Sequence, residues 1–356
     1  MISISKLIAR RVVVVILFVL VPSEAIRIIT AMKDWARPRL AYSLIDLGSN
    51  EMVPMNLADQ PSVINDSGDI ALSLSDATLL MPRAPGRACL IRNGKQITLP
   101  IPSGCDRSWV SGMNGHSQIV GFAQNLKTTQ GQTLIWTGVK LTKVMNWTPF
   151  NLVINDSGDL AGTGVIDDHY KGFSLIAGRK VMVPDAIFTR SNIYGLNNHG
   201  VAVGFGSGER SNDMPFLFDQ GKVIKLDTGS FKGIAGAYAI NDAGDVVGGC
   251  GNPTLWANNK RVDLGSFADD GFALGINDNR QIVGFCRWDR NIVQLYMNAD
   301  RQHAFLWQKG TMYDLNDCVN EKDWVLINAS SINNKGEIVG TGEYHGESHV
   351  FLLKPR

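Results

Sequence analysis

The sequence predicts an all-β fold, a seven-bladed β-propeller made of four-stranded blades. Three observations predict it: one turn phrase recurs seven times, apolar strand-like segments follow every copy, and a segment near the N-terminus supplies the strand that the last unit lacks. The composition agrees, because 37 glycines among 356 residues and only 19% charged residues are typical of a turn-rich, packed chain.

The repeated phrase centres on an asparagine that follows an apolar residue and, in most copies, precedes a glycine by three positions. An Asn side chain can bond the backbone two residues on, and the glycine supplies a positive φ, so the phrase predicts a tight hairpin with a bulge. The uneven spacing of the copies assigns the insertions to loops. The seven asparagines are Asn65, Asn114, Asn155, Asn197, Asn241, Asn277 and Asn333.

The segment after each phrase reads as a strand buried on both faces, because the fifth and sixth positions beyond the Asn are apolar in every copy. The seventh position is glycine in six copies, and Leu72 is the exception. Glycine inside a strand marks a close backbone approach. We expect that approach where the blades crowd toward the central axis. The six glycines are Gly121, Gly162, Gly204, Gly248, Gly284 and Gly340.

Two further strands follow in each unit, typified by Ala304–Trp307 and Val262–Gly265, so that each unit has strands A to D. After the seventh C strand, which ends near Leu353, the sequence has no D strand. The segment Tyr42–Gly48 has the D-strand pattern and precedes the first A strand. We therefore expect it to pair beside Phe351 and close the ring, which protects the sheet edges.

These hairpins with their glycine-ended strands, together with His303-Ala304-Phe305-Leu306-Trp307, resemble the HAF-repeat family of extracellular repeats. The resemblance covers about residues 42–353. His349-Val350-Phe351 is close to the motif, and the other five units lack the His. The resemblance implies an extracytoplasmic, propeller-like repeat and carries over no catalytic residue.

The N-terminus reads as a targeting segment. Basic residues end at Arg11, an apolar run follows from Val12 to Val21, and a small-residue cleavage site ends at Ala25. Ten apolar residues are too few to span a bilayer. We expect a cleaved signal peptide, with an uncleaved membrane anchor and a cytosolic start as the alternatives.

This assignment gives three segments: residues 1–25 as signal peptide or membrane anchor, 26–41 as linker and 42–356 as propeller. The predicted location is secreted or in the cell envelope, with membrane contact only through an uncleaved N-terminal segment. Removing residues 1–25 leaves 31 Lys and Arg (34 − 3) against 32 Asp and Glu (33 − 1), a net charge of about −1. Such a chain has no electrostatic footprint for nucleic acid.

Acidic and histidine groups raise three site hypotheses, each with a plainer interpretation. The acidic turns offer about three oxygens each, whereas calcium needs six or more, so turn structure is favoured over calcium. The alternating Glu343, His345, Glu347 and His349 suit a metal, but glycines interrupt the strand and His349 falls at the framework His position. The cluster 167–169 has no nucleophile or orienting partner. We therefore predict no catalytic residue, metal or cofactor.

Five aromatic residues approach the repeat asparagines. They could form a ring that stacks a sugar or a peptide, or they could pack between blades, and their odd sequence offsets favour packing. They are Trp109, Phe150 and Phe272, five residues before an Asn, and Tyr194 and Tyr238, three before.

Five cysteines leave at least one thiol without an intramolecular partner. Cys250 and Cys286 lie at equivalent positions of neighbouring blades, too far apart for a disulfide, so we expect them to be unbonded. Cys89 and Cys105, within or beside the first blade, are the better candidate pair.

The B–C and D–A connections share one face of a propeller, and here they carry the length variation, so this face is the predicted binding surface. The insertion 287–302 holds the candidate ligand-binding residues Trp288, Arg290, Tyr296 and Arg301; the alternative is a solvated loop. The sequence favours a non-catalytic module that binds a glycan or a protein. A propeller hydrolase or lyase with a site at the channel mouth and a structural envelope component are the alternatives.

Overall fold

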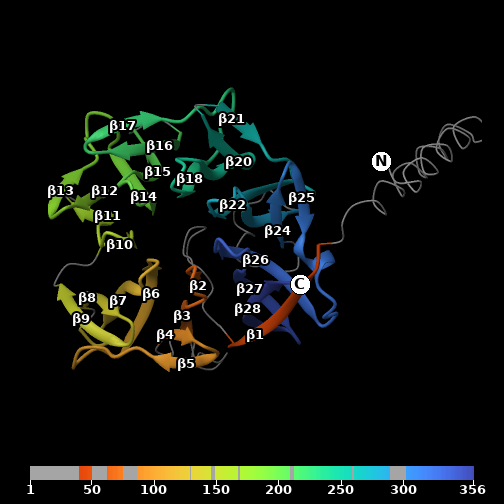
Figure 1. Ribbon diagram of the computed structural model, residues 1–356. Helices are drawn as coiled ribbons and strands as arrows, with labels where there is room; N and C mark the ends of the chain where they lie inside the picture. Colours follow the sequence, from red (N-terminus) through yellow and green to blue (C-terminus); the bar gives the residue numbers. More distant parts are fainter. Residues whose placement is uncertain are drawn as a thin grey trace, which may run out of the picture. The chain divides into compact units, whose positions relative to one another are not determined.

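A computed structural model of the chain describes residues 40–49, 62–74, 86–128, 130–145, 149–166, 169–208, 212–258, 260–288 and 302–356. Seven four-stranded antiparallel sheets stand side by side around a central axis, as Figure 1 shows. The predicted seven-bladed β-propeller is therefore confirmed.

Each blade uses four strands in sequence order, from the innermost strand A to the outermost strand D. Blade 1 has β2 (Ser62–Ile64), β3 (Ile70–Leu74), β4 (Arg87–Arg92) and β5 (Lys95–Thr98). Blade 2 has β6 (Arg107–Met113), β7 (Gln118–Gln124), β8 (Gly131–Thr137) and β9 (Lys140–Met145). Blade 3 has β10 (Phe150–Ile154), β11 (Leu160–Ile166), β12 (His169–Ile176) and β13 (Arg179–Met182). Blade 4 has β14 (Arg190–Leu196), β15 (Ala202–Ser207), β16 (Met214–Asp219) and β17 (Lys222–Lys225).

The remaining blades follow the same plan, except that the last one takes its D strand from the start of the chain. Blade 5 has β18 (Ala235–Ile240), β19 (Val246–Cys250), β20 (Asn252–Ala257) and β21 (Lys260–Asp263). Blade 6 has β22 (Asp270–Ile276), β23 (Ile282–Arg287), β24 (Gln302–Gln308) and β25 (Thr311–Asp314). Blade 7 has β26 (Trp324–Ile332), β27 (Ile338–Tyr344), β28 (Glu347–Pro355) and β1 (Tyr42–Ser49).

The closure of the ring by the N-terminal strand is confirmed. Strand β1 pairs antiparallel with β28, placing Tyr42 opposite Pro355 and Asp46 opposite Phe351. Tyr42 is buried, and Asp46 accepts a hydrogen bond from the His349 ring at 3.0 Å. The last blade therefore joins the two ends of the propeller and leaves β28 without an open edge.

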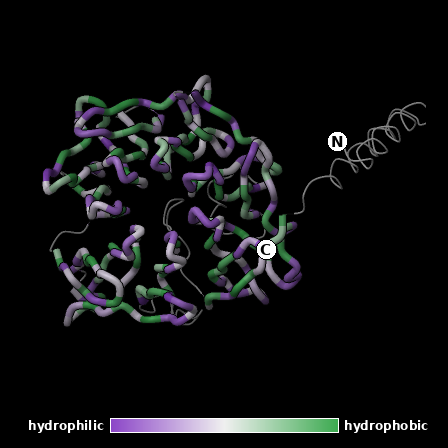
Figure 2. Tube along the Cα trace, in the orientation of Figure 1, coloured by the Kyte–Doolittle hydropathy of each residue, from purple (hydrophilic) through white to green (hydrophobic). Residues whose placement is uncertain are grey.

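The core lies between the blades, as expected from strands buried on both faces. All fourteen residues at the fifth and sixth positions after the repeat asparagines are buried. In one cluster Val120 and Phe122 of blade 2 pack against Leu160 and Phe173 of blade 3. Hydrophobic stretches are present in every blade in Figure 2. Each blade therefore depends on its neighbours for burial, which is the usual basis of stability in repeat folds.

The repeated strand glycines do mark a close approach, but it lies within a blade and not between blades. A Cβ on Gly284 would overlap the carbonyl oxygen of Phe272 on the A strand of the same blade. That A strand carries a β-bulge next to this point, between Ala273 and Gly275, and the bulge bends it toward the B strand. Blade 1 explains the exception: β2 pairs with β3 without a register shift, so Leu72 lies opposite Ser62 with room for its side chain.

Replacing Gly284 by Ala should destabilise the protein by about 2–3 kcal/mol, because the added methyl meets backbone that cannot rotate away. Gly162→Ala is the matched control, since its nearest backbone atom would lie 3.0 Å from the new Cβ, and it should cost less. Urea denaturation measures both. Equal unfolding midpoints for wild type and Gly284→Ala would show that the bulge relaxes freely.

Helical structure is minimal in the part of the chain that the structure describes. A single 3-10 turn, η3 (Leu315–Cys318), follows β25, and its first turn is capped by the Asp314 side chain, which accepts from the Asn316 backbone N–H. No helix among these residues has the length and apolar character needed to cross a bilayer. The predicted signal peptide, residues 1–25, and almost all of the linker lie outside the described residues.

Candidate functional site

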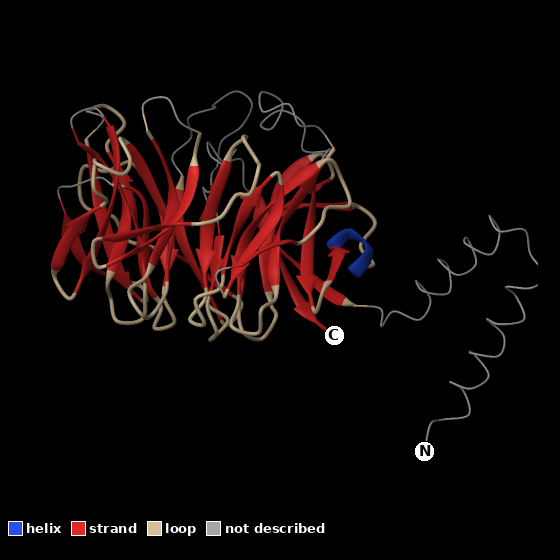
Figure 3. Ribbon diagram, turned by 90° about the horizontal axis from the view of Figure 1, so that it is seen from above, coloured by secondary structure: helices blue, strands red, loops and turns tan. Residues whose placement is uncertain are grey.

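The connections between strands lie at the two ends of the ring, which Figure 3 shows in side view. The A–B and C–D turns lie at one end, here called the turn face. The B–C and D–A connections lie at the other end, here called the variable face.

At the turn face, each repeat asparagine folds its own hairpin as predicted. Asn65 is typical, because its Oδ1 accepts from the backbone N–H groups of Ser67 at 3.1 Å and Asp69 at 3.0 Å. All seven asparagines are buried, at 3–6% exposure. The Asx-turn interpretation of the phrase is confirmed.

The same asparagines also join the blades, which the sequence analysis missed. The Nδ2 group of each one donates to the backbone carbonyl of the asparagine in the next blade, over 2.8–3.3 Å, and Asn333 completes the circuit by donating to Asn65. We call this closed set of seven hydrogen bonds the asparagine ring. It is a turn motif and an interblade link at once.

A second, more exposed circuit surrounds the asparagine ring. In this circuit, the side chain of the residue after the repeat Asn accepts a hydrogen bond from the backbone N–H of the equivalent residue in the preceding blade. For example, Asp66 Oδ1 accepts from the backbone N–H of Asn334 at 2.7 Å. The circuit is interrupted at Gly115, which has no side chain to accept. Its other members are Asp156, Asn198, Asp242 and Asp278. Among the residues described, no three His, Cys, Asp or Glu side chains converge as ligands for one metal ion.

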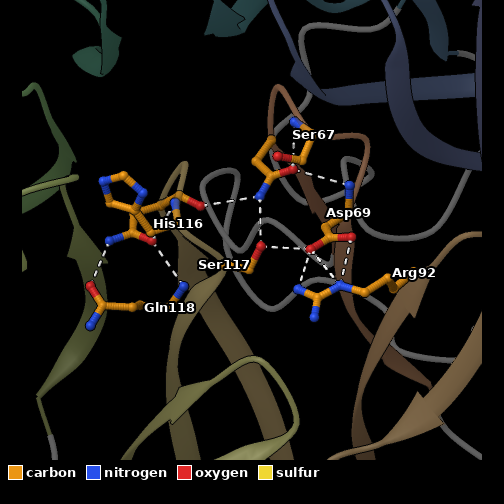
Figure 4. A network of polar contacts seen from close by, with 8 residues as sticks. Ser67, Asp69, Arg92, His116, Ser117 and Gln118 are labelled. Carbon is orange, nitrogen blue, oxygen red and sulfur yellow. Dashed lines mark hydrogen bonds and ion pairs between the residues drawn. The ribbon is translucent and has the colours of Figure 1, made fainter.

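Figure 4 shows how the asparagine ring is supported between blades 1 and 2. Asp69 binds the Arg92 guanidinium and also accepts from the Ser117 hydroxyl at 2.6 Å. Ser117 in turn accepts from Asn65 Nδ2 at 3.1 Å. Burial alone would raise the pKa of Asp69, but the hydrogen bonds from Arg92 and Ser117 outweigh it and lower that pKa.

This pKa has a consequence for acid stability. A carboxyl whose pKa is lower in the folded state stabilises the fold above its unfolded pKa of about 3.9, and loses that effect as the pH falls through the folded value. Arg92→Ala should therefore lower the melting temperature more at pH 7 than at pH 3. Thermal unfolding at both pH values measures this, with the exposed Lys95→Ala as control. An equal loss at both pH values would contradict the role given to Asp69.

The variable face presents most of the exposed apolar side chains. Of twelve exposed large hydrophobic residues in the described part of the chain, seven lie there, four lie on D strands, and one, Val139, lies in a turn of the turn face. The seven are Leu126, Val165, Tyr170, Ile187, Phe231, Ile234 and Trp288. Exposed apolar groups gathered on one face are typical of an interaction surface.

Trp288, a residue predicted from the sequence, lies at the end of β23 and is 42% exposed. Its ring meets His303 edge-on at 4.8 Å and lies 5.9 Å from Phe267. His303 Nδ1 in turn lies 2.6 Å from Asp314 Oδ2. We call these four residues the Trp288 cluster. It holds an exposed indole in a defined orientation.

Blade 7 repeats this arrangement at equivalent positions. His349 lies edge-on to Tyr344 at 5.5 Å and bonds Asp46 of β1 at 3.0 Å. In blade 5 an amide replaces the imidazole, because Asn252 donates to Asp263 at 3.0 Å. The His of the repeat therefore links strand C to strand D, in agreement with the framework role predicted for His349.

Arg287 lies next to Trp288 and is buried, with 5% of its surface exposed. Its guanidinium binds the Asp270 carboxylate, with Nη2 2.8 Å from Oδ2, and lies 5.7 Å from the centre of the Phe272 ring. Nη1 has no hydrogen-bond partner. The residue before Trp288 is thus a guanidinium whose charge is neutralised by Asp270 and whose Nη1 NH2 group has no hydrogen-bond partner.

The other predicted binding residues, Arg290, Tyr296 and Arg301, lie outside the described residues, as do Asp167 and Asp168. No sequence pattern pointed to Phe267 or Asp314, because only the fold brings these distant segments to Trp288 and His303. Arg287 is adjacent to Trp288 in the chain, but its burial and its pairing with Asp270 show only in the structure.

The aromatic residues near the repeat asparagines pack between blades, as favoured above. Tyr238 and Phe272 are buried and lie 6.0 Å apart across blades 5 and 6, and Tyr194 of blade 4 lies 5.5 Å from Tyr238. Trp109 instead packs against Phe122 within blade 2. The Phe150 side chain lies outside the described part of the structure.

None of the five cysteines forms a disulfide bond. Cys250 and Cys286 are unbonded as predicted, but the candidate pair Cys89 and Cys105 was wrong. Cys89 packs into the cluster shared with blade 7, whereas Cys105 packs into the cluster shared with blade 2, so they face opposite sides of blade 1. Burial raises the pKa of the Cys286 thiol to about 11, which makes it a poor nucleophile.

Comparison with known proteins agrees with the β-propeller class and goes no further. No protein-family model and no curated protein matches the chain. Among solved structures it resembles U3-55K, at 12% identity and a TM-score of 0.52, over 87% of this chain and 98% of that one. It also resembles the β-propeller domain of Cps50 from Myceliophteria thermophila, at 8% identity and a TM-score of 0.50, over 86% and 99%.

A third similar structure is a larger enzyme, the acylaminoacyl peptidase of Pyrococcus horikoshii. The match has 11% identity and a TM-score of 0.45, and it covers 71% of this chain. The chain spans only 44% of the length of that peptidase. The likenesses to U3-55K and to the Cps50 domain show the fold alone.

Proposed function

We propose that this chain is an extracytoplasmic repeat protein of the HAF-repeat type that acts as a non-catalytic binding module, with a glycan or protein ligand on the variable face. The observation that carries the proposal is the concentration of exposed apolar side chains on that face, with Trp288 held by His303 and Asp314. Rigid aromatic groups give contact area at low entropic cost.

The N-terminal segment supports an extracytoplasmic location, because residues 1–25 have the charge and hydropathy order of a signal peptide. The repeat motif supports the family assignment, since the His303–Asp314 and His349–Asp46 pairs give the motif histidine a structural role. A framework repeated in every blade, with connections of variable length, suits a binding scaffold.

A combined glycan and peptide array tests the proposal, with the wild-type chain and Trp288→Ala. The wild type should bind a defined subset of spots, and Trp288→Ala should lose at least about tenfold in affinity for them. Val139→Ala is the matched control, because it removes an exposed apolar group from the turn face. Wild type that binds no spot, or a Trp288→Ala variant that binds as well as wild type, would contradict the proposal.

A further inference from the structure

The outermost strands of blades 1–5 are strongly basic. Figure 1 places these D strands, β5, β9, β13, β17 and β21, in succession around the rim of the ring. Within their bounds they carry one acidic residue, Asp263, and nine basic residues, all of them exposed. We call the surface formed by these nine residues the basic wall. They are Lys95, Lys140, Lys143, Arg179, Lys180, Lys222, Lys225, Lys260 and Arg261.

The basic wall covers only part of the rim. Within their bounds, the D strands of blades 6 and 7, β25 and β1, have no basic residue and contribute the acids Asp314 and Asp46. The positive charge is therefore a property of five neighbouring blades and does not repeat around the whole ring.

Five of the nine residues lie at one equivalent position, the first residue of each D strand. Each pairs with the last residue of strand C, three positions earlier, as Lys222 does with Asp219. A Cβ on Gly221, beside Lys222, would lie 3.4 Å from Val181 of the preceding D strand, so neighbouring D strands adjoin. The fold thus sets five cations at one level along the wall. They are Lys95, Lys140, Arg179, Lys222 and Lys260.

These five cations have no counterion within the described part of the chain, because no salt bridge there joins any of them to an acidic side chain. Other acids lie at the inner strands, since Asp66, Asp156 and Asp242 belong to the circuit around the asparagine ring. A net charge near zero therefore conceals a separation of charge between the inner strands and the rim. A surface of one sign attracts a partner of the opposite sign.

The shape and the side chains of the wall favour a linear sugar polymer. A convex surface that spans five blades meets a flat membrane over one or two blades only, whereas a linear chain can follow it. Within their bounds, the five D strands contain no aromatic residue, and single-stranded nucleic acids are bound by aromatic stacking. Ile224 and Val262, each 40% exposed, instead offer apolar contact to the C–H groups of sugar rings.

We propose that the basic wall binds a linear acidic polysaccharide, whose carboxylate or sulfate groups pair with the cations of successive blades. Four of the five equivalent residues are Lys, whose compact charge suits either anion. The wall lies on the D strands and not on the variable face, so this inference goes beyond the proposed function.

A triple variant of the full chain, Lys140→Gln, Arg179→Gln and Lys222→Gln, neutralises three successive blades and tests the proposal. The probes are polygalacturonate and dextran sulfate, with fully methyl-esterified polygalacturonate as the neutral polymer. In isothermal titration, wild type should bind an acidic polymer and not the neutral one. The triple variant should bind at least about tenfold more weakly, and raising the salt from about 50 to about 200 mM should weaken wild-type binding by at least about tenfold.

The matched control is a second triple variant, Lys127→Gln, Lys322→Gln and Lys335→Gln. It makes the same change in net charge at three exposed lysines that lie outside the D strands. Its affinity should stay within about twofold of wild type, because distant exposed charges are screened. Both triple variants should melt as wild type does, since exposed side chains contribute little to stability.

Equal losses of affinity in the two triple variants would overturn the proposal, as would failure of wild type to bind either acidic polymer. Oligo-dT and phosphatidylglycerol vesicles represent the competing partners, and tighter binding of either one would also overturn it. Trp288→Ala separates this proposal from the binding site on the variable face. It should keep wild-type affinity for the acidic polymers, and a loss there would move their binding away from the wall.

Discussion

Asn197→Asp is expected to destabilise the propeller by about 2–4 kcal/mol at neutral pH. The carboxylate keeps the Oδ1 acceptor for the His199 and Val201 backbone N–H groups, so the turn survives. It loses the amide that donates to the Asn241 carbonyl at 3.2 Å and turns a negative oxygen toward that carbonyl. Asn197 is 5% exposed, so water cannot replace the lost donor freely.

Urea denaturation at pH 7 measures this effect. The control is Asn93→Asp, the same substitution in an exposed C–D turn, which should stay within about 0.5 kcal/mol of wild type. Similar small effects for both variants would mean that the asparagine ring contributes turns but no link between blades.

Removing residues 1–49 should have the largest effect, a loss of more than about 4 kcal/mol in unfolding free energy or conversion to oligomers. The deletion takes away β1, including the buried Tyr42 and the Asp46 partner of His349. It also opens the edge of β28, whose residues Phe351 and Leu353 are fully buried in the intact blade. An unpaired edge of this kind recruits other strands.

Deletion of residues 1–39 is the matched control, because it leaves all of β1 in place. Light scattering after size exclusion and thermal unfolding distinguish the two truncations. If the chain lacking residues 1–49 matched the chain lacking residues 1–39 in stability and oligomeric state, the closure of blade 7 by β1 would be refuted.

The architecture was predictable from sequence because its signals are local and repeated. Seven asparagine phrases count the blades, and the D-strand pattern at Tyr42–Gly48 identifies the closing strand. From the sequence, β-bulges were predicted only in the turns. The bulges in the A strands were missed, because the bulged position is not occupied by the same residue type in every blade. The role of glycines such as Gly284 was therefore misplaced between blades.

The sequence does contain a signal for the hydrogen bonds of the asparagine ring. Asp at the repeat position would also accept from the two turn N–H groups, but an ionised carboxylate has no donor, whereas Asn adds a side-chain N–H donor. The use of Asn in all seven copies thus points to a second bond, such as the one from Asn241 to Asn277 at 3.1 Å.

Of the four residues of the Trp288 cluster, only Trp288 was predicted as a site residue from the sequence. Trp288 stands out as an aromatic at the start of a long insertion, but Phe267, His303 and Asp314 reach it from three separate segments. The Cys89–Cys105 error has the same origin, because sequence proximity does not show which side of a blade a side chain faces.

Hydrogen exchange of the full chain tests the central claim, a ring closed by its own N-terminal strand, most directly. Peptides covering Tyr42–Ser49 should exchange slowly and in step with those covering Glu347–Pro355, because the two strands share one ladder of hydrogen bonds. Exchange of Tyr42–Ser49 at the rate of an unstructured segment, with Glu347–Pro355 still protected, would contradict closure of the ring.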